Sequence, residues 1–125
     1  VYDTATNRWA QAADLPTPRS VPSSSVIDGR LYVMGGAFFR GPTSSTEELL
    51  RTMRILSVVE VYDPASARWT RGADLATARS LFSTSVVNGK VYVVGGLSLA
   101  PDAGTLGAKI TFPGIEVSPP PRSAP

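Results

Sequence analysis

Short apolar runs separated by turn residues recur along the chain and favour β-strands over helices. The segment 25–36, SVIDGRLYVMGG, holds two such runs joined by an Asp-Gly pair, and the segment 85–96, SVVNGKVYVVGG, holds two joined by an Asn-Gly pair. Asp-Gly and Asn-Gly between apolar runs are strong signals for a two-residue hairpin turn, because both turn positions require a positive φ. Each segment is therefore predicted to form a β-hairpin.

A third apolar run lies at 58–64, VVEVYDP, and ends at Asp63-Pro64. The proline presets the φ of a turn there, and the aspartate can bond the backbone beyond it. A fourth, short run surrounds Trp69. Together with the hairpin at 25–36, these runs predict a four-stranded antiparallel meander with almost no helix.

The chain also repeats itself with a shift of 60 residues. Between residues 1–36 and 61–96, 20 of the 36 aligned positions are identical without a gap. The two tryptophans of the chain, Trp9 and Trp69, fall on the same position of the repeat. Identity at this level indicates an internal repeat, which is typical of solenoids and propellers.

The repeated positions resemble the kelch motif, the unit of kelch β-propellers. The resemblance rests on two glycines after an apolar run, a Tyr-Asp pair and a tryptophan at fixed spacings, and it covers residues 1–36 and 57–96. The matching residues are Val1, Tyr2, Asp3, Trp9, Arg19 and 31–36 in the first copy, and Glu60, Val61, Tyr62, Asp63, Pro64, Trp69, Arg79 and 91–96 in the second. The resemblance implies an all-β fold, a partial kelch β-propeller of four-stranded antiparallel blades.

The paired glycines could instead belong to a phosphate-binding loop. Such a loop runs into a helix N-terminus, whereas Pro101 and Gly104 make the segment after Gly96 a poor helix. We therefore assign the glycines to close backbone packing and turning, and the aromatic residues to the widening space between blades. The residues given these structural roles are Gly35, Gly36, Gly95, Gly96, Tyr2, Tyr62, Trp9 and Trp69.

Candidate binding residues lie in the loops. The kelch resemblance implies that the loop leading into the innermost strand lies on the ligand-binding face, although a salt bridge or a bond to loop carbonyls is the structural alternative for its arginine. A second loop carries an apolar and basic cluster that is unusual for a surface segment. The candidates are Arg19, Ser20, Phe38, Phe39, Arg40, Arg79 and Ser80.

The period of 60 residues exceeds the roughly 50 of a kelch unit, and the excess lies in an insertion at 37–56. Within it, Ser45 and Glu48 fit a capping box, so one short helix is predicted at 46–54. The resemblance implies that this loop contributes to recognition. A surface insertion without function is the alternative.

The repeat also predicts the domain organisation. Residues 1–20 are expected to hold the outer strands of a partial blade and a link, 21–75 a complete blade with the insertion, and 76–117 a partial second blade. The Pro-rich tail at 118–125 is expected to be disordered or PPII-like. Because a propeller needs four or more blades to close, the chain is expected to be a fragment of a longer kelch protein.

Composition narrows the chemistry further. The chain has no cysteine and no histidine, which removes disulfides, thiolate catalysis and the commonest metal ligand. No catalytic residue, metal site or cofactor is therefore assigned. The net charge of +2, carried by scattered arginines, indicates neither a nucleic-acid partner nor a membrane surface, and the apolar runs are too short to span a bilayer.

The favoured function is that of a protein-interaction module. Its blades, together with the remaining kelch blades of a longer chain, would bind a protein or peptide through the loops at 16–22, 37–56 and 76–82, without enzymatic activity. One alternative is part of a kelch-type propeller enzyme such as a sugar isomerase. Another is a remnant without function. The sequence does not indicate a localisation.

Overall fold

The computed structural model describes residues 1–42, 44–101, 108–111 and 114–117, and its regular structure is almost entirely β-strand. The elements are β1 (Tyr2–Asp3), β2 (Arg8–Trp9), β3 (Ser23–Ile27), β4 (Arg30–Met34), β5 (Ala37–Phe38), α1 (Thr46–Thr52), β6 (Arg54–Ile55), β7 (Val59–Asp63), β8 (Arg68–Arg71), β9 (Ser83–Val87), β10 (Lys90–Val94), β11 (Ser98–Pro101), β12 (Ala108–Thr111) and β13 (Ile115–Val117). No helix among the described residues is long and apolar enough to cross a membrane. The predicted all-β class is confirmed.

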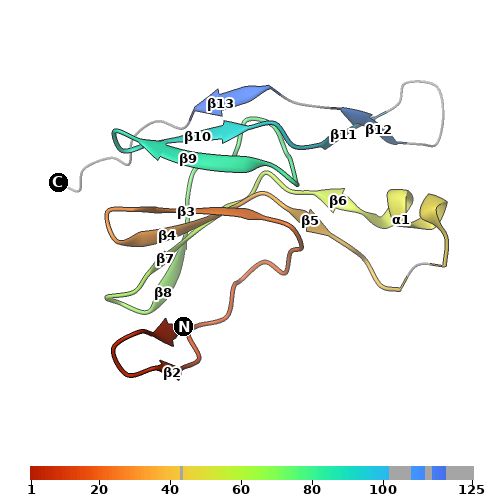
Figure 1. Cartoon of the computed structure of the whole chain (residues 1–125). Coiled ribbons are helices and arrows are strands. Elements are labelled where there is room, and N and C mark those ends of the chain that lie inside the picture. Colours follow the sequence, from red (N-terminus) through yellow and green to blue (C-terminus); the bar gives the residue numbers. More distant parts are fainter. Residues whose placement is uncertain (43, 102–107, 112–113, 118–125) are drawn as a thin grey trace.

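Four antiparallel strands form the first sheet, in the order β3-β4-β7-β8 (Figure 1). Tyr32 on β4 lies opposite Ser25 on β3 and Val61 on β7. The turn between β3 and β4 has φ values of 48° at Asp28 and 73° at Gly29, as a two-residue hairpin turn requires. The four-stranded meander is therefore present as predicted.

The second sheet has the order β13-β10-β9 and repeats the register of the first. Tyr92 lies opposite Ser85 and Val117, as Tyr32 lies opposite Ser25 and Val61 in the first sheet. Strand β13 therefore takes the place of the first half of β7, although the repeat is shorter by four residues at this point. The tail at 118–125 lies outside the described residues.

The insertion forms a small extension at the end of the first sheet where β4 ends and β7 begins. Strand β5 pairs with β6, and α1 lies between them. The Oγ of Ser45 accepts a hydrogen bond from the backbone N–H of Glu48, while the Glu48 carboxylate accepts from the backbone and hydroxyl of Ser44. The predicted helix is present, but it ends at Thr52, and its reciprocal cap is displaced by one residue.

The second sheet carries a similar extension, which the sequence pattern did not reveal. Strand β11 follows β10 and pairs with β12. Both extensions project from the same end of the sheet stack (Figure 1), and β11 contacts β6. Strands β6 and β11 of the two extensions therefore lie side by side.

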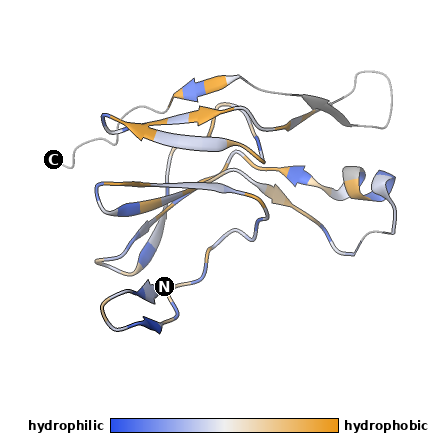
Figure 2. Ribbon diagram, in the orientation of Figure 1, coloured by the Kyte–Doolittle hydropathy of each residue, from blue (hydrophilic) through white to orange (hydrophobic). Residues whose placement is uncertain are grey.

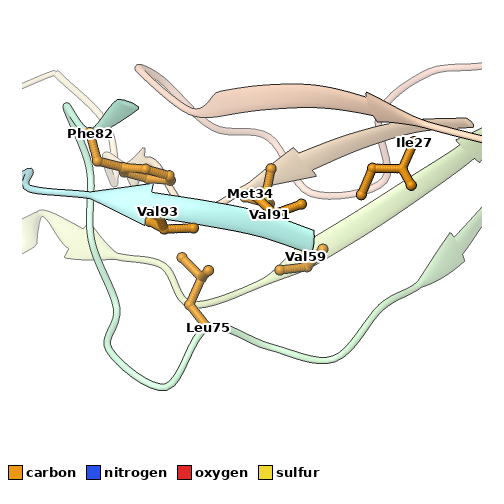
Figure 3. Close-up of a cluster of buried hydrophobic side chains, with 7 residues drawn as sticks. All are labelled: Ile27, Met34, Val59, Leu75, Phe82, Val91 and Val93. Atoms are coloured by element: carbon orange, nitrogen blue, oxygen red, sulfur yellow. The ribbon is translucent and has the colours of Figure 1, made fainter. Parts of the chain in front are cut away.

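The hydrophobic core lies between the two sheets (Figure 3). It consists of Ile27, Met34, Val59, Leu75, Phe82, Val91 and Val93, with Tyr32 packed against it. The innermost strands β3 and β9 are joined by hydroxyl contacts of 2.9 and 2.8 Å from Ser23 and Ser25 to Thr84 Oγ1. Small polar residues on these strands allow the sheets to approach closely.

Candidate functional site

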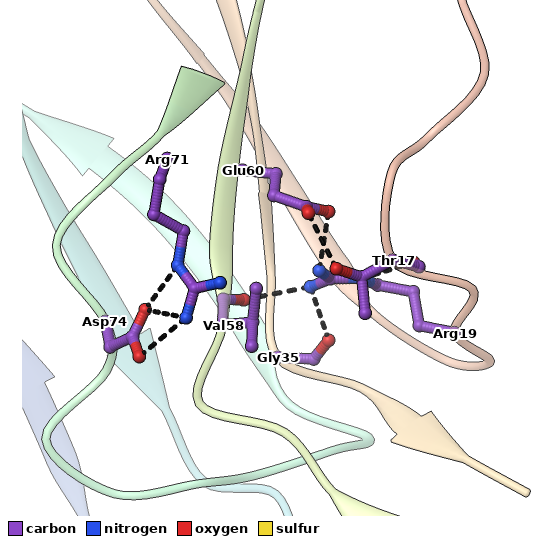
Figure 4. Close-up of polar contacts among 7 residues, drawn as sticks. All are labelled: Thr17, Arg19, Gly35, Val58, Glu60, Arg71 and Asp74. Atoms are coloured by element: carbon purple, nitrogen blue, oxygen red, sulfur yellow. Dashed lines mark hydrogen bonds and ion pairs between the residues drawn. The ribbon is translucent and has the colours of Figure 1, made fainter. Parts of the chain in front are cut away.

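A buried arginine joins three segments of the first unit (Figure 4). The side chain of Arg19 has no exposed surface, and its Nη1 donates to the carbonyl oxygens of Gly35 and Val58, each at 2.9 Å. Its Nη2 donates to Glu60 Oε2 at 2.7 Å, and its Nε to the carbonyl of Thr17 at 3.2 Å. Burial lowers the pKa of Arg19, and the Glu60 carboxylate opposes this shift by favouring the charged form.

The second unit contains the same arrangement. Arg79 Nη1 donates to the carbonyl oxygens of Gly95 at 3.0 Å and Gly114 at 2.8 Å, and Nη2 donates to Glu116 Oε2 at 3.1 Å. The Glu116 carboxylate also accepts from the backbone N–H groups of Ala76 and Thr77. We call each set of bonds from the arginine to the two carbonyl oxygens and the glutamate the arginine clamp.

The arginine clamps give Arg19 and Arg79 the contacts of the structural alternative, and a binding role for either residue stays a prediction. Both side chains are buried, and their N–H groups are directed into the blade. The salt bridge and carbonyl bonds, which the sequence left as an alternative, describe both residues.

The backbones of Ser20 and Ser80 form hydrogen bonds that join neighbouring loops. Ser20 exchanges two hydrogen bonds with Ala37, of 2.7 and 2.8 Å, and Ser80 exchanges two with Leu97, of 3.0 and 2.9 Å. These bonds tie the loop before β3 or β9 to the loop after β4 or β10. Ser80 is buried, whereas Ser20 is exposed, so only Ser20 presents its side chain to solvent.

The remaining binding candidates lie in the insertion. Phe38 is half-buried on β5, while Phe39 and Arg40 follow it and are exposed. The structure therefore leaves Ser20, Phe39 and Arg40 accessible on the loops at one end of the sheets.

Two exposed apolar residues at this end were missed by the sequence analysis. Val21 and Leu81 occupy equivalent positions and have φ values of 47° and 55°. A positive φ is costly for a side chain other than glycine, and especially for a β-branched one. The Leu81 N–H points to the carbonyl of Val21 at 3.5 Å, so the two loops touch. In the sequence, both residues follow an Arg-Ser pair, and this repeated apolar position in a loop could have identified them.

Three of the four paired glycines, Gly35, Gly36 and Gly96, lie in close backbone contact with another loop. A Cβ on Gly36 would lie 2.7 Å from the carbonyl oxygen of Ser20, and one on Gly96 would lie 2.6 Å from that of Ser80. A Cβ on Gly35 would overlap the carbonyl oxygen of Arg79 in the other unit, whereas one on Gly95 would meet nothing within 4 Å.

The repeated aromatic pairs have the same geometry but different surroundings. The ring centroids of Tyr62 and Trp69 lie 5.1 Å apart, and those of Tyr2 and Trp9 lie 5.2 Å apart. Trp69 is half-buried and donates its Nε1–H to the carbonyl of Ala13 at 2.9 Å. Trp9 is 79% exposed, so the expected burial between blades does not hold for it in this structure.

Arg71 and Asp74 form a two-pronged ion pair beside the first arginine clamp (Figure 4). The hydrogen bond from Arg71 lowers the pKa of Asp74. A folded-state pKa below the unfolded value of about 3.9 means that this carboxylate adds stability at neutral pH, which is lost as the pH falls through the folded pKa.

Replacing Asp74 by asparagine is expected to lower the free energy of unfolding at pH 7 by no more than about 1 kcal/mol, because the pair is exposed. The effect should shrink as the pH falls through the lowered pKa of Asp74, because the carboxylate is then protonated in both the folded and the unfolded state. Urea titrations at pH 7 and at acid pH measure the difference. Asp14→Asn is the matched control, because Gln11 stands at the position of Arg71 there. A loss that is equal at both pH values would contradict the assignment.

The loops at this end of the sheets carry side chains of several chemical classes. Within the described ranges, no group of three or more acidic, histidine or cysteine residues could hold a metal ion. The accessible side chains are apolar, hydroxyl and guanidinium groups, together with the carboxylates of Glu47 and Glu48 on α1.

The sequence profile of the Kelch motif matches residues 18–76. An F-box/kelch-repeat protein of Arabidopsis thaliana is 36% identical over 97 residues, which is 78% of this chain and 23% of that protein. The chain belongs to the kelch-repeat family. Kelch-like protein 9 of Mus musculus is 34% identical over 106 residues, covering 85% of this kelch chain and 16% of the relative.

Among solved structures, that of YjhT has a TM-score of 0.59 with 33% sequence identity, over 73% of the kelch chain and 25% of YjhT. The fold is therefore a partial kelch β-propeller. The chain spans less than a quarter of the length of the two curated relatives named above.

Proposed function

We propose that this kelch chain is an interaction module that binds a protein or peptide partner through its loop edge. The loop edge consists of residues 16–22, 37–56 and 76–82, which meet at the end of the sheets where β3 and β9 begin. Loops held on a rigid scaffold commonly carry binding function.

The observation that carries the proposal is the pair of strained and exposed apolar residues in the loop edge. Val21 and Leu81 both have a positive φ and about half of their surface open to solvent. Backbone strain of this kind persists where surrounding structure enforces it, and it concentrates at binding sites. A partner that covers these side chains with apolar groups of its own would remove apolar surface from water, and this burial would favour binding.

Hydrogen bonds between the loops support a preformed surface. The Gly36 N–H donates to the carbonyl of Arg79 at 2.9 Å, and the Arg79 N–H donates to the carbonyl of Leu56 at 3.2 Å. The insertion is thereby fixed to the loop of the following unit. A surface ordered before binding loses less conformational entropy when a partner arrives.

A displayed peptide library, selected on the full chain, tests the proposal. Peptides that bind the loop edge should lose at least about tenfold in affinity with Val21→Asn or Leu81→Asn. Asparagine tolerates a positive φ, so these variants remove the apolar side chain and keep the backbone.

Ala67→Asn is the matched control, because Ala67 is an exposed residue with a φ of 53° in the turn between β7 and β8, at the opposite end of the sheet. It should bind the selected peptides as the parent chain does. Enriched peptides that bind both loop-edge variants normally, or a library that yields no binder, would overturn the proposal.

A further inference from the structure

The turn between β9 and β10 exposes an asparagine, Asn88, that is followed by glycine. Figure 2 shows hydrophilic residues at this turn, between the apolar residues of the two strands. The only other asparagine of the chain, Asn7, is followed by arginine. The hydroxyl of Tyr2 donates a hydrogen bond to Asn7 Oδ1, whereas no hydrogen bond within the described ranges holds the side chain of Asn88. The amide of Asn88 is therefore free to rotate.

The backbone nitrogen of Gly89 is the nearest atom along the chain that can attack this amide. The last pair of the β9–β10 ladder is Val87 with Lys90, so the N–H of Gly89 lies outside the ladder. Glycine has no Cβ that could obstruct an approach to its nitrogen, and a Cβ built on Gly89 would meet nothing within 4 Å. Neither strand pairing nor packing therefore separates this nitrogen from the side-chain carbonyl carbon of Asn88.

The equivalent turn of the first unit shows what surrounds such a site when another sheet packs on the blade. Asp28 and Gly29 have φ values of 48° and 73°, and Asn88 and Gly89 have values of 49° and 71°. Asp28 is exposed although the second sheet packs against the first. A neighbouring sheet therefore leaves this turn in solvent, and an aspartate fits the first position of the turn.

We propose that Asn88 is a site of spontaneous deamidation in the folded chain. The backbone nitrogen of Gly89 bonds to the side-chain carbonyl carbon of Asn88, and the bond from that carbon to the side-chain nitrogen breaks. Ammonia leaves with the proton of the Gly89 amide. Water then opens the five-membered imide at one of its two carbonyl carbons. Water is the only co-reactant, and nothing is oxidised or reduced.

The two products of ring opening differ in their effect on the hairpin. Both replace a neutral amide by a carboxylate, which lowers the net charge of +2 by one. Opening that restores the original backbone gives aspartate, the residue that the first unit carries in this turn. Opening at the other carbonyl gives isoaspartate and adds a carbon to the backbone between Val87 and Lys90, whose pairing fixes the register. Because Val91 and Val93 on β10 are 2% and 1% exposed, a change in the position of this strand reaches the core.

Incubation of the full folded chain in mildly alkaline buffer, followed by tryptic digestion and mass spectrometry, tests the proposal. Trypsin cleaves after arginine and lysine, so it releases Asn88 in the peptide 80–90 and Asn7 in the peptide 1–8. Deamidation of the first peptide should be at least about tenfold faster than that of the second, because no Cβ obstructs the attack. It should yield two products of equal mass that separate by chromatography. A sample digested without incubation corrects for deamidation during the digest.

Two variants separate the chemistry of the turn from its surroundings. Asp28→Asn places the same pair of residues in the first unit, and the peptide 20–30 should then deamidate at a rate close to that of Asn88. Gly89→Ala should slow the reaction at Asn88, because the new Cβ obstructs the attacking nitrogen and enters open space.

Three results would overturn the proposal. The first is a folded chain in which Asn88 reacts no faster than Asn7, or reacts only in urea. The second is an Asp28→Asn variant that stays intact, because the reaction at Asn88 would then depend on the missing neighbour of the second sheet. The third is a folded Gly89→Ala variant that reacts as fast as the parent chain, because the amide would then be lost by direct hydrolysis.

Discussion

Glu60→Ala is expected to lower the free energy of unfolding by about 3–5 kcal/mol, because it leaves the charge of Arg19 buried without its partner. The side chains of Arg19 and Glu60 are 0% and 7% exposed, and their charged atoms lie 2.7 Å apart. Glu60 also accepts a hydrogen bond of 2.7 Å from Thr17. Removing the carboxylate therefore leaves two donors without their acceptor.

Urea unfolding followed by fluorescence measures this loss. Glu47→Ala is the control, because Glu47 also pairs with an arginine, Arg51, but on the exposed surface of α1. It should leave the midpoint of the blade transition unchanged. If Glu60→Ala were no worse than Glu47→Ala, the carbonyl bonds of Gly35 and Val58 alone would suffice to hold Arg19, and the glutamate would have no part in the arginine clamp.

The second large effect on stability is expected to differ between two glycines at the same position of the repeat. Gly35→Ala should destabilise the chain by about 2–5 kcal/mol, which combines the strain of alanine at a φ of 58° with overpacking against the carbonyl of Arg79. Gly95→Ala should cost only the strain, about 1–2 kcal/mol, because its Cβ enters open space.

Thermal or urea unfolding of the two variants at low concentration provides the comparison, since each is the other's control. Equal losses at low concentration would mean that the approach of Gly35 to the other unit adds nothing to stability.

Local chemistry allowed the sequence to predict the sheet. The Asp-Gly and Asn-Gly turns fix the hairpins, and the carboxylates of Asp3 and Asp63 each accept from a backbone N–H two residues on, at Ala5 and Ala65, as turn aspartates do. The N-terminus of α1 could likewise be predicted from the N-cap residue Ser45. These features depend only on residues close together in the chain.

Features that depend on residues far apart in the chain could not be predicted from the sequence. The repeated arginines could be identified in the sequence, but the glutamates that pair with them lie beyond the insertion. Glu60 and Glu116 are separated by 56 residues, whereas the earlier positions of the repeat are separated by 60. A fixed shift of 60 therefore does not align Glu116 with Glu60, and the repeat by itself did not pair Glu116 with Arg79. The same change in spacing hid the β11–β12 extension.

The arginine clamp also keeps the structure of a blade independent of the length of the loop that it closes. In one unit, Arg19 holds carbonyls on both sides of a loop, at Gly35 and Val58, and in the other, Arg79 does so at Gly95 and Gly114. The two loops differ by four residues, yet the guanidinium closes both in the same way. Insertions and deletions between the clamped carbonyls can thus accumulate without disturbing strand register, so this is the place where new specificity can evolve, or a foreign loop can be grafted, at little cost to folding.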